Sequence, residues 1–383
     1  MKVCGIIAEY DPFHLGHLYH LRQAKAQSGA DFLVCVLGSA FSQRGDAMLF
    51  STRDRARMAL ENGIDLVLGM PVSFSCAQAN RFACGGVGIL HRLGIITHLS
   101  FGCETDDLSL ITAVARLLGQ PDKAFIAGMK DSLSGGASFA RAQGEALQAA
   151  LPGMPKSLIA APNFILAVSY MRELDRLGSD IRAVPVQRRG AYHGTAQDSF
   201  ASAGAIRAMW IQGSISRAFA SCPAASTAIM RDAHTHLPDA LDKVLLSRLT
   251  SAQTQELQTC PEISEGLEKR ILAMAREADS RAALLRLVKT KRYPHARINR
   301  ALSQALLGIK RSPAAPGYTR LLGFHGRARP LLRAIAQAGF PLISRPVRSG
   351  DPGVALDMRA EELWHLGSGQ SAAAAWRQRI VIL

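Results

Sequence analysis

Short apolar runs alternate with amphipathic stretches in the first half of this chain, and this alternation constrains the fold more than any other feature. The runs predict buried strands, and the stretches between them predict helices. The expected strands are Lys2–Ala8, Phe32–Leu37, Leu66–Leu68 and His98–Phe101, and the expected helices are His17–Gln27, Thr52–Asn62 (opening at a Ser51/Thr52 cap) and Cys76–Leu93. The pattern predicts an α/β fold with a parallel, doubly wound sheet, whose ligands bind at the carboxyl ends of the strands.

The second half of the chain loses the strand pattern. After Asp107 it is rich in Ala and Leu, and from about Ser214 to Lys310 helical patterns carry clustered Arg and Lys. Further expected elements are a helix over Pro162–Arg176, a strand over Ile181–Val186, a helix over Ala203–Gln212 and a loop over Ser312–Gly317, before a short α/β piece. We therefore expect residues 1–210 to form the α/β domain and residues 211–383 a mainly α-helical basic domain.

Composition limits the class of protein. The chain has 383 residues, of which 48% are hydrophobic and 20% charged, as in folded domains. Its formal charge of +15 favours a polyanionic partner such as a nucleic acid, although basic proteins can also simply be soluble. Seven cysteines without a Cys-x-x-Cys pair argue against a disulfide framework or a zinc ribbon. Because no apolar run reaches membrane-spanning length and the N-terminal run is too short for a signal peptide, we expect a cytoplasmic protein with no membrane partner.

The segment Asp11–His17 follows the first expected strand directly and carries the most informative motif. A strand that breaks at Pro12 and restarts as a helix at Gly16 places His14 and His17 at one point, together with free helix N–H groups and the positive end of the helix dipole. This combination favours phosphate binding and attack on the α-phosphate of a nucleotide. A metal site formed by the His14, His17 and His20 rings, or no role at all, are the alternatives.

A second anion site is suggested by the sequence from Ser199 to Arg207. Ser202 is a plausible N-cap, and small residues at 203–205 let a phosphate approach the backbone. Arg207 would then hold β- and γ-phosphate oxygens and stabilise the leaving pyrophosphate. A plain capped surface helix is the alternative interpretation.

Together the two motifs resemble those of the nucleotidyltransferase superfamily, whose fold is Rossmann-like. Further segments are similar, in the same order, to the bacterial tRNA(Met) cytidine acetate ligase family. They are Gly5–His20, Ser42–Asp46, Phe101–Glu104, Pro162–Leu166, Tyr192–His193, Ser202–Arg207, Val288–Tyr293 and Leu322–Phe324. The chain departs from the family pattern at Asp11, Ala40, Cys103, Gly194 and Gly204.

The resemblance implies a ligase that forms acetyl-adenylate from acetate and ATP and then acetylates the wobble cytidine of elongator tRNA(Met). It implies catalytic roles for His14, His17 and Arg207, with ATP as substrate and Mg²⁺ as its companion. The ATP-binding residues it implies, together with the Ser202 cap, are Ile7, Ala8, Glu9, Tyr10, Asp11, Pro12, Phe13, His14, Leu15, Gly16, His17, Leu18, Tyr19, His20, Gly102, Asn163, Arg188, Arg189 and Ser202. No protein-held metal site is expected.

Three of these positions have physical interpretations of their own. Gly102 ends an apolar strand, where a side chain would collide with an adenine or ribose, or it is simply a turn glycine. Asn163 at a helix start favours a cap over a hydrogen bond to the nucleotide. Arg188 leaves a strand toward the same sheet edge, where it binds phosphate or is solvated. The loop Gln43–Asp46 receives no role.

The segment from Lys289 to Arg300 packs cations around one tyrosine. Such a patch neutralises RNA phosphates, and the tyrosine would stack on an unpaired base, although a solvated face is the common alternative. The expected tRNA-binding residues are Lys289, Lys291, Arg292, Tyr293, Arg297 and Arg300.

Glu9 and Asp11 are candidates, by proximity alone, for the base in acetyl transfer.

Two other functions remain open from the sequence. A small-molecule adenylyltransferase of the pantetheine-phosphate or nicotinamide-mononucleotide type would explain Asp11 but not the large basic second half. A non-catalytic RNA-binding protein would not need His14, Gly16, His17 and Arg207 intact. The sequence leaves the oligomeric state open.

Overall fold

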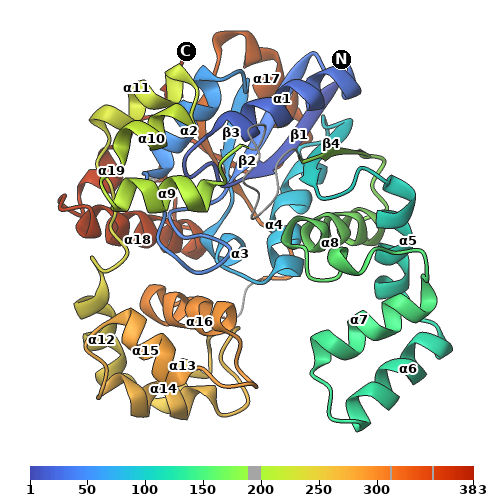
Figure 1. Cartoon of the computed structure of the whole chain (residues 1–383). Coiled ribbons are helices and arrows are strands. Elements are labelled where there is room, and N and C mark those ends of the chain that lie inside the picture. Colours follow the sequence, from blue (N-terminus) through green and yellow to red (C-terminus); the bar gives the residue numbers. More distant parts are fainter. Residues whose placement is uncertain (189–199, 311–312, 347–348) are drawn as a thin grey trace.

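One central sheet organises the molecule (Figure 1). The computed structural model describes residues 1–188, 200–310, 313–346 and 349–383. The strand order is β5-β4-β1-β2-β3-β6-β7, with β8 paired to β6. The strands are β1 (Val3–Ala8), β2 (Phe32–Leu37), β3 (Leu66–Gly69), β4 (His98–Cys103), β5 (Arg182–Gln187), β6 (Thr319–Phe324), β7 (Leu342–Ile343) and β8 (Val381–Ile382).

The four strands expected in the first half and the strand expected over Ile181–Val186 are confirmed. These five strands pair in parallel, in the register Val3↔Phe32 for β1 and β2 and Cys4↔His98 for β1 and β4. The sequence did not predict that β6 would extend this sheet antiparallel to β3. The C-terminal α/β piece, grouped above with residues 211–383, therefore adds its strands to the first-half sheet. The division at residue 210 stays a prediction for the helical segment between them.

Helices cover both faces of the sheet and form two lobes beside one of its ends (Figure 1). The helices are α1 (Leu15–Ser28), α2 (Thr52–Glu61), α3 (Val72–Ser75), α4 (Ala79–Arg92), α5 (Leu108–Gly119), α6 (Lys123–Ser134), α7 (Phe139–Ala150), α8 (Pro162–Arg176), α9 (Ala203–Ile211), α10 (Ile215–Ala220), α11 (Ala224–Asp232), α12 (Asp242–Thr250), α13 (Thr254–Leu257), α14 (Leu267–Ala275), α15 (Arg281–Val288), α16 (His295–Leu307), α17 (Arg329–Ala338), α18 (Pro352–Gly367) and α19 (Ala374–Arg377). Single 3₁₀ turns lie at Lys156–Leu158 and Gly326–Ala328.

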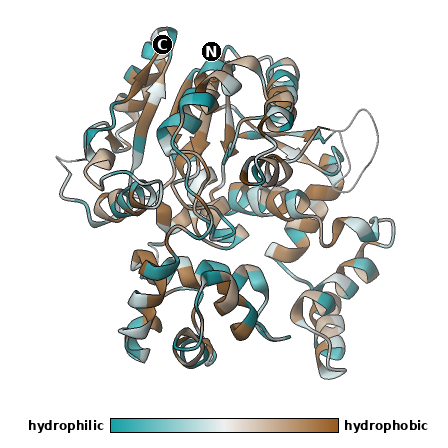
Figure 2. Ribbon diagram, turned by 60° about the vertical axis from the view of Figure 1, so that its left-hand side comes forward, coloured by the Kyte–Doolittle hydropathy of each residue, from teal (hydrophilic) through white to brown (hydrophobic). Residues whose placement is uncertain are grey.

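Alternating strand residues belong to two different hydrophobic cores, which confirms the doubly wound arrangement. Val34 and Val36 pack with α4, α5, α8 and α17 on one face, whereas Leu33 and Cys35 pack with α1, α2 and α11 on the other. A third core, built mainly from α12 and α14–α16, also includes Phe41 from the first half. In Figure 2 the hydrophobic colour is densest along the strands and on the helix faces turned toward them. None of the described helices is both long enough and apolar enough to cross a bilayer.

Candidate active site

A buried arginine holds together the loops at the carboxyl edge of the sheet. Arg55 of α2 is fully buried, and its Nη1 donates to the carbonyls of Glu9 (2.7 Å) and Gly38 (3.0 Å), which follow β1 and β2. Its Nη2 donates to the Ser39 carbonyl (2.6 Å), and its Nε to that of Phe50 (3.1 Å). The guanidinium therefore fixes the ends of two neighbouring strands relative to each other. Sequence reasoning missed it, although its spacing of four from buried Ala59 places it on the apolar face of α2.

At the start of α1, His14 and His17 form a reciprocal capping box. Nδ1 of His14 accepts the Gly16 N–H (3.0 Å), and Nδ1 of His17 accepts the His14 N–H (3.3 Å). The two rings stack with centroids 3.7 Å apart. Gly16 is required because a Cβ there would lie 2.9 Å from the His14 ring.

This geometry corrects one expectation from the sequence. The first amides of α1 are not free for a phosphate, because Leu15 N–H donates to the Ser221 carbonyl (3.0 Å), Gly16 N–H to the His14 ring and His17 N–H to the His14 carbonyl (2.9 Å). The donors left for an anion are on the imidazoles. A neutral imidazole whose Nδ1 accepts a hydrogen bond carries its proton on Nε2.

The three histidines of the motif are neutral near pH 7. Burial, assisted by the nearby positive charge of Arg188, lowers the pKa of His14 to about 3 and that of His20 to about 4. Burial and the neighbouring imidazoles hold the pKa of His17 well below its ordinary value. His14 and His17 therefore act as neutral Nε2–H donors, while Nε2 of His20 bonds Ser100 Oγ (3.1 Å).

Arg207 and Asp11 join the two motifs that the sequence placed far apart. Nη1 of Arg207 donates to the Asp11 carbonyl (2.8 Å), and its Nε lies 3.8 Å from the Asp11 carboxylate. Both oxygens of that carboxylate also accept backbone N–H groups, from Leu49 and Phe50 (2.9 Å each). Asp11 is therefore occupied in holding the loop and Arg207. Ser202 caps α9 as predicted, accepting the Ala205 N–H (3.2 Å).

The opposite side of the histidine cluster is formed by β4 and β5. Arg188 follows β5 directly, its N–H donates to the Cys103 carbonyl (2.9 Å), and a Cβ on Gly102 would meet its Cγ at 3.6 Å. The expectation that Asn163 caps a helix is wrong, because Ala161 is the N-cap of α8. Asn163 instead donates from Nδ2 to Glu104 Oε1 (2.8 Å), since Glu104 comes from the neighbouring strand end.

Several predicted ATP-binding residues contribute framework rather than free side chains. The Tyr10 and Phe13 side chains are buried in the core beneath α1. The Ile7 side chain packs so tightly against Gly86 of α4 that a Cβ there would overlap it. The other members of the segment Ala8–Leu18 lie at or beside the sheet edge, and Tyr19 has its ring 6.0 Å from that of Phe200. Arg189, Tyr192 and His193 lie outside the described residues.

Some of the residues that depart from the family pattern are buried, and another lies where a larger side chain would fit. Ala40 and Cys103 are fully buried, and burial raises the pKa of the Cys103 thiol to about 11. A Cβ on Gly204 would lie 3.9 Å from Ser202 Oγ, so a larger residue fits there. Gly194 lies outside the described residues.

The loop Gln43–Asp46, to which the sequence gave no role, connects the sheet edge to the basic helices. The Gln43 N–H donates to Glu9 Oε1 (2.7 Å) on the sheet side. On the helical side, Nδ2 of Asn299 in α16 donates to Asp46 Oδ1 (2.7 Å) and to the Arg44 carbonyl (2.9 Å). Gly45, at φ +95°, packs directly on the α16 backbone, where a Cβ would have no room.

The predicted tRNA-binding segment divides into committed and exposed cations. Nε of Arg300 donates to Glu262 (2.9 Å), and Nη1 of Arg297 to Glu265 (3.2 Å). Tyr293 is 7% exposed and its hydroxyl donates to the Glu265 carbonyl (2.6 Å), so the expectation that it stacks on a base is wrong in this arrangement. The side chains of Lys289, Lys291 and Arg292 lie at the surface.

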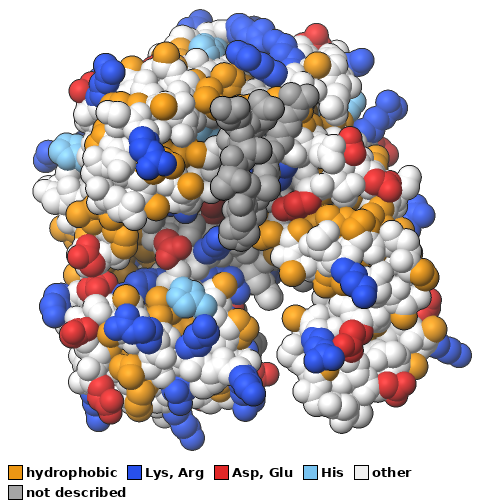
Figure 3. All heavy atoms as spheres, viewed as in Figure 1, with side chains coloured by type: hydrophobic (Ala, Val, Ile, Leu, Met, Phe, Trp, Pro, Cys, Tyr) orange, Lys and Arg blue, Asp and Glu red, His pale blue; other side chains and the backbone are white. Residues whose placement is uncertain are grey.

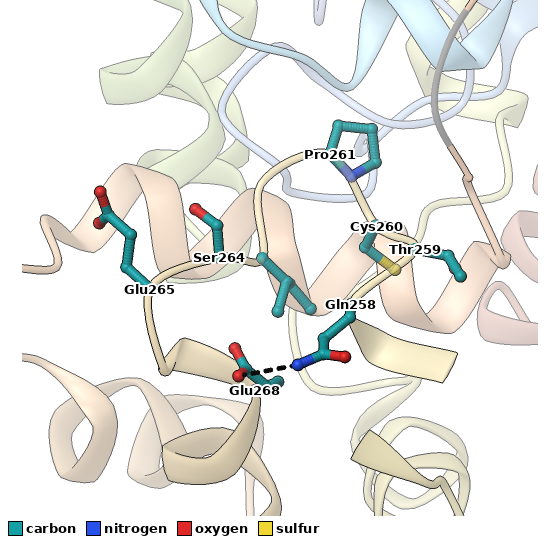
Figure 4. A pocket seen from close by; sticks show the side chains of 8 residues that line it. Gln258, Thr259, Cys260, Pro261, Ser264, Glu265 and Glu268 are labelled. Carbon is teal, nitrogen blue, oxygen red and sulfur yellow. Dashed lines mark hydrogen bonds between the residues drawn. The ribbon is translucent and has the colours of Figure 1, made fainter. Parts of the chain in front are cut away.

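The loop that binds these arginines lines a polar pocket of about 320 Å³ (Figure 4). Gln258 and Glu268 face each other across it, with Nε2 donating to Oε1 at 3.2 Å. Figure 3 shows Lys and Arg side chains gathered on the lobe of α12–α16, and an open gap between this lobe and that of α6 and α7. Further exposed cations of the α12–α16 lobe are Lys243, Lys269, Arg276, Arg286 and Lys310.

Comparisons with known proteins agree with this geometry. The family model described as HIGH Nucleotidyl Transferase matches residues 1–378. A tRNA(Met) cytidine acetate ligase of Clostridium kluyveri is 31% identical over 96% of this chain and 95% of its own, and one of Clostridium perfringens is 33% identical over 88% and 87%. A crystal structure of Thermotoga maritima TmcAL bound with alpha-thio ATP superposes with a TM-score of 0.90 at 27% identity, covering 100% of both chains.

Proposed function

The chain belongs to the HIGH nucleotidyl transferase family and, within it, to the tRNA(Met) cytidine acetate ligases, and on this premise we propose that it acetylates a cytidine of tRNA(Met) using acetate and ATP. The wobble cytidine of the elongator tRNA is the proposed acceptor. Because its substrate is tRNA, we propose that the enzyme acts in the cytoplasm. The observation that carries the proposal is the pair of neutral imidazoles, His14 and His17, beside Arg207 at the carboxyl edge of the sheet.

In the first step, an acetate oxygen bonds to the α-phosphorus of ATP, and the bond from that phosphorus to the oxygen bridging to the β-phosphate breaks. The Nε2–H groups of His14 and His17 donate to phosphate oxygens. Because these donors are neutral, they add no positive charge that would bind the anionic product tightly. Arg207 neutralises the departing pyrophosphate from the other side. Catalysis in this step is positioning and electrostatics.

In the second step, the exocyclic amine of the cytidine bonds to the acetyl carbon, the bond to AMP breaks and the amine loses a proton. Glu9 suits the role of proton acceptor better than Asp11, because both Asp11 oxygens already accept backbone N–H groups. Burial raises the pKa of Glu9, which brings this carboxylate closer to the pKa of a useful general base.

Mg²⁺ enters the proposal only as a companion of the triphosphate. Among the described residues, no three His, Cys, Asp or Glu side chains gather into a set that would hold a metal ion. Mg²⁺ that accompanies ATP is commonly held by phosphate oxygens and water, and no step is assigned to it.

The test is exchange of labelled pyrophosphate into ATP with and without acetate, followed by mass spectrometry of nucleosides from tRNA incubated with enzyme, ATP and acetate. We expect exchange to require acetate and N4-acetylcytidine to form in elongator tRNA(Met). Exchange that ignores acetate but responds to a phosphopantetheine or nicotinamide mononucleotide would contradict the proposal in favour of a small-molecule adenylyltransferase.

A further inference from the structure

A second cavity, of about 280 Å³, lies where the sheet edge meets the basic helices, and we call it the junction cavity. Its walls come from the loop after β2, from α9, and from α12, α15 and α16. Its apolar lining includes Phe41, Leu49, Leu241, Leu245 and Leu285. Arg207 also lines it, so the cavity borders the candidate nucleotide site directly.

His236 also belongs to this lining, but both of its ring nitrogens are closed off from the cavity. The side chain is 3% exposed, and neither of its ring nitrogens has a hydrogen-bond partner among the described residues. Burial lowers its pKa, so the ring is neutral and offers one donor and one acceptor. Its backbone is fixed by the bond from His236 N–H to the Leu49 carbonyl (2.9 Å), and its Nε2 packs closely against Gly367. The ring therefore contributes packing to the wall of the cavity and no hydrogen bond to a ligand inside it.

The charges of the junction cavity select against anions. Asp46, Asp239 and Asp242 all belong to its lining. Of the two cations, Arg207 is assigned to the pyrophosphate of the nucleotide site, and Arg281 is committed to the Asn299 side chain and carbonyl (both 2.8 Å), the Gly45 carbonyl (3.0 Å) and Ser303 Oγ (2.7 Å). Acetate or a phosphate would meet three carboxylates with little compensation, whereas an amino group would find acceptors.

Size narrows the ligand further. The volume lies just below the roughly 300–1,000 Å³ typical of small-molecule sites, so the cavity suits one ring system rather than a whole nucleotide. Apolar walls suit the faces of a planar ring, and carboxylates suit an exocyclic amine on its edge. A nucleobase bearing an amino group has all of these features.

We propose that the junction cavity receives the acceptor cytosine of the tRNA, turned out of its loop. The apolar walls cover the faces of the base, and the carboxylates accept one N–H of its exocyclic amine. Arg207 at the border sets the amine beside the activated acetyl group. This inference rests on the proposed function, and it adds the place where the RNA base binds.

The test blocks the cavity without touching the nucleotide site. Ala282 lines the cavity from the exposed side of α15, so Ala282→Trp fills the space without entering the protein core. The matched control is Ala273→Trp, on the exposed surface of α14 outside the lining. We expect Ala282→Trp to keep acetate-dependent exchange within about twofold of the parent enzyme and to lower acetylcytidine formation at least tenfold, while Ala273→Trp keeps both.

A second readout compares tRNA transcripts with cytidine or uridine at the wobble position, since uridine lacks the amine. The parent enzyme should bind the cytidine transcript about tenfold more tightly, the size of one good base contact, and Ala282→Trp should lose this preference. Normal acetylation by Ala282→Trp, or an unchanged preference for cytidine, overturns the inference. Failure of the parent enzyme to form acetylcytidine would instead overturn the proposed function, so the two failures are distinguishable.

Discussion

The candidate nucleotide site and the basic segment Lys289–Arg300 both use cationic and polar side chains, but they use them in opposite ways. At the nucleotide site nearly every polar group is already bonded: Arg55 to four carbonyls, Asp11 to two amides, and the Nδ1 atoms of His14 and His17 to backbone N–H groups. In the basic segment Arg292, Arg297 and Arg300 pair with glutamates, and Lys289 and Lys291 lie exposed at the surface.

The difference fits what each region is proposed to bind. In-line attack at phosphorus depends on donor positions held to fractions of an ångström, and only a fully bonded, buried framework provides that. Binding RNA phosphates requires positive charge but no precise donor geometry, so exposed, salt-screened cations are enough. Each prediction below tests one side of this contrast against the other.

The largest effect is expected from removing the framework cation. Arg55→Met leaves the carbonyls of Glu9, Gly38, Ser39 and Phe50 buried without their donor, so we expect the free energy of unfolding to fall by about 3 kcal/mol or more. Urea unfolding measures it. The control Arg57→Met removes an exposed arginine paired with Glu61 on the same helix and should cost under about 0.5 kcal/mol. Equal effects of the two would show that the framework does not depend on Arg55.

The next effect separates the two nitrogens of His17. Glutamine places an amide near the position of Nε2, whereas asparagine places one near Nδ1, which only completes the capping box. We expect His17→Asn to lower acetate-dependent exchange by about 10²–10³, the usual cost of one transition-state donor, and His17→Gln to lose clearly less. The reverse order would mean that the cap, and not the Nε2–H donor, carries the role of His17.

A smaller and salt-dependent effect is expected in the basic segment. Replacing Lys289, Lys291 and Arg292 together by Ala should weaken tRNA binding and reduce the slope of log affinity against log salt by about 2, with exchange unchanged. Titration of binding at several salt concentrations measures it. The control triple, Arg22, Lys25 and Arg333 to Ala, removes exposed cations from α1 and α17, remote from α12–α16, and should leave the slope unchanged (Figure 1).

The sequence predicted the strands and helix starts of this molecule, but not the long-range contacts that join its parts. Apolar periodicity located β1–β5, since a strand buried on both faces leaves a run of apolar residues, and cap chemistry located Ser51 and Ser202 at helix starts. The resemblance then grouped His14, His17 and Arg207, and the hydrogen bond from Arg207 to the Asp11 carbonyl joins Arg207 to the segment that carries the two histidines.

What the sequence did not give depends on long-range pairing. The partner of β6 is β3, roughly 250 residues earlier, and short apolar runs carry no signal of which strand they join. Tyr293 beside five cations indicated an RNA-binding surface, but the buried packing of its ring is set by Glu265 on a preceding loop. The junction cavity has no motif of its own in the sequence, because segments far apart along the chain enclose it.

The last prediction concerns pH and the neutral histidines. The pKa of His20 in the folded protein is about 4, below the 6.5 of an unfolded chain, so the unfolded state binds the extra proton between these values. The contribution of His20 is therefore complete above pH 6.5 and is lost progressively as the pH falls toward 4. Glu9, whose pKa is raised by burial, acts in the opposite direction, so the informative quantity is the difference between variants.

His20→Gln keeps an amide near Ser100 and removes the titration, so the unfolding free energy should depend less steeply on pH between 6.5 and 4, by up to about 1.4 kcal/mol per pH unit. Urea titrations at several pH values measure this slope. His295→Gln, on the exposed start of α16, is the matched control and should leave the slope as it is. If the two variants changed this slope equally, the His20 ring would be as open to protonation as a histidine of the exposed basic segment. The contrast between the fully bonded nucleotide site and the exposed basic segment would then not hold for His20.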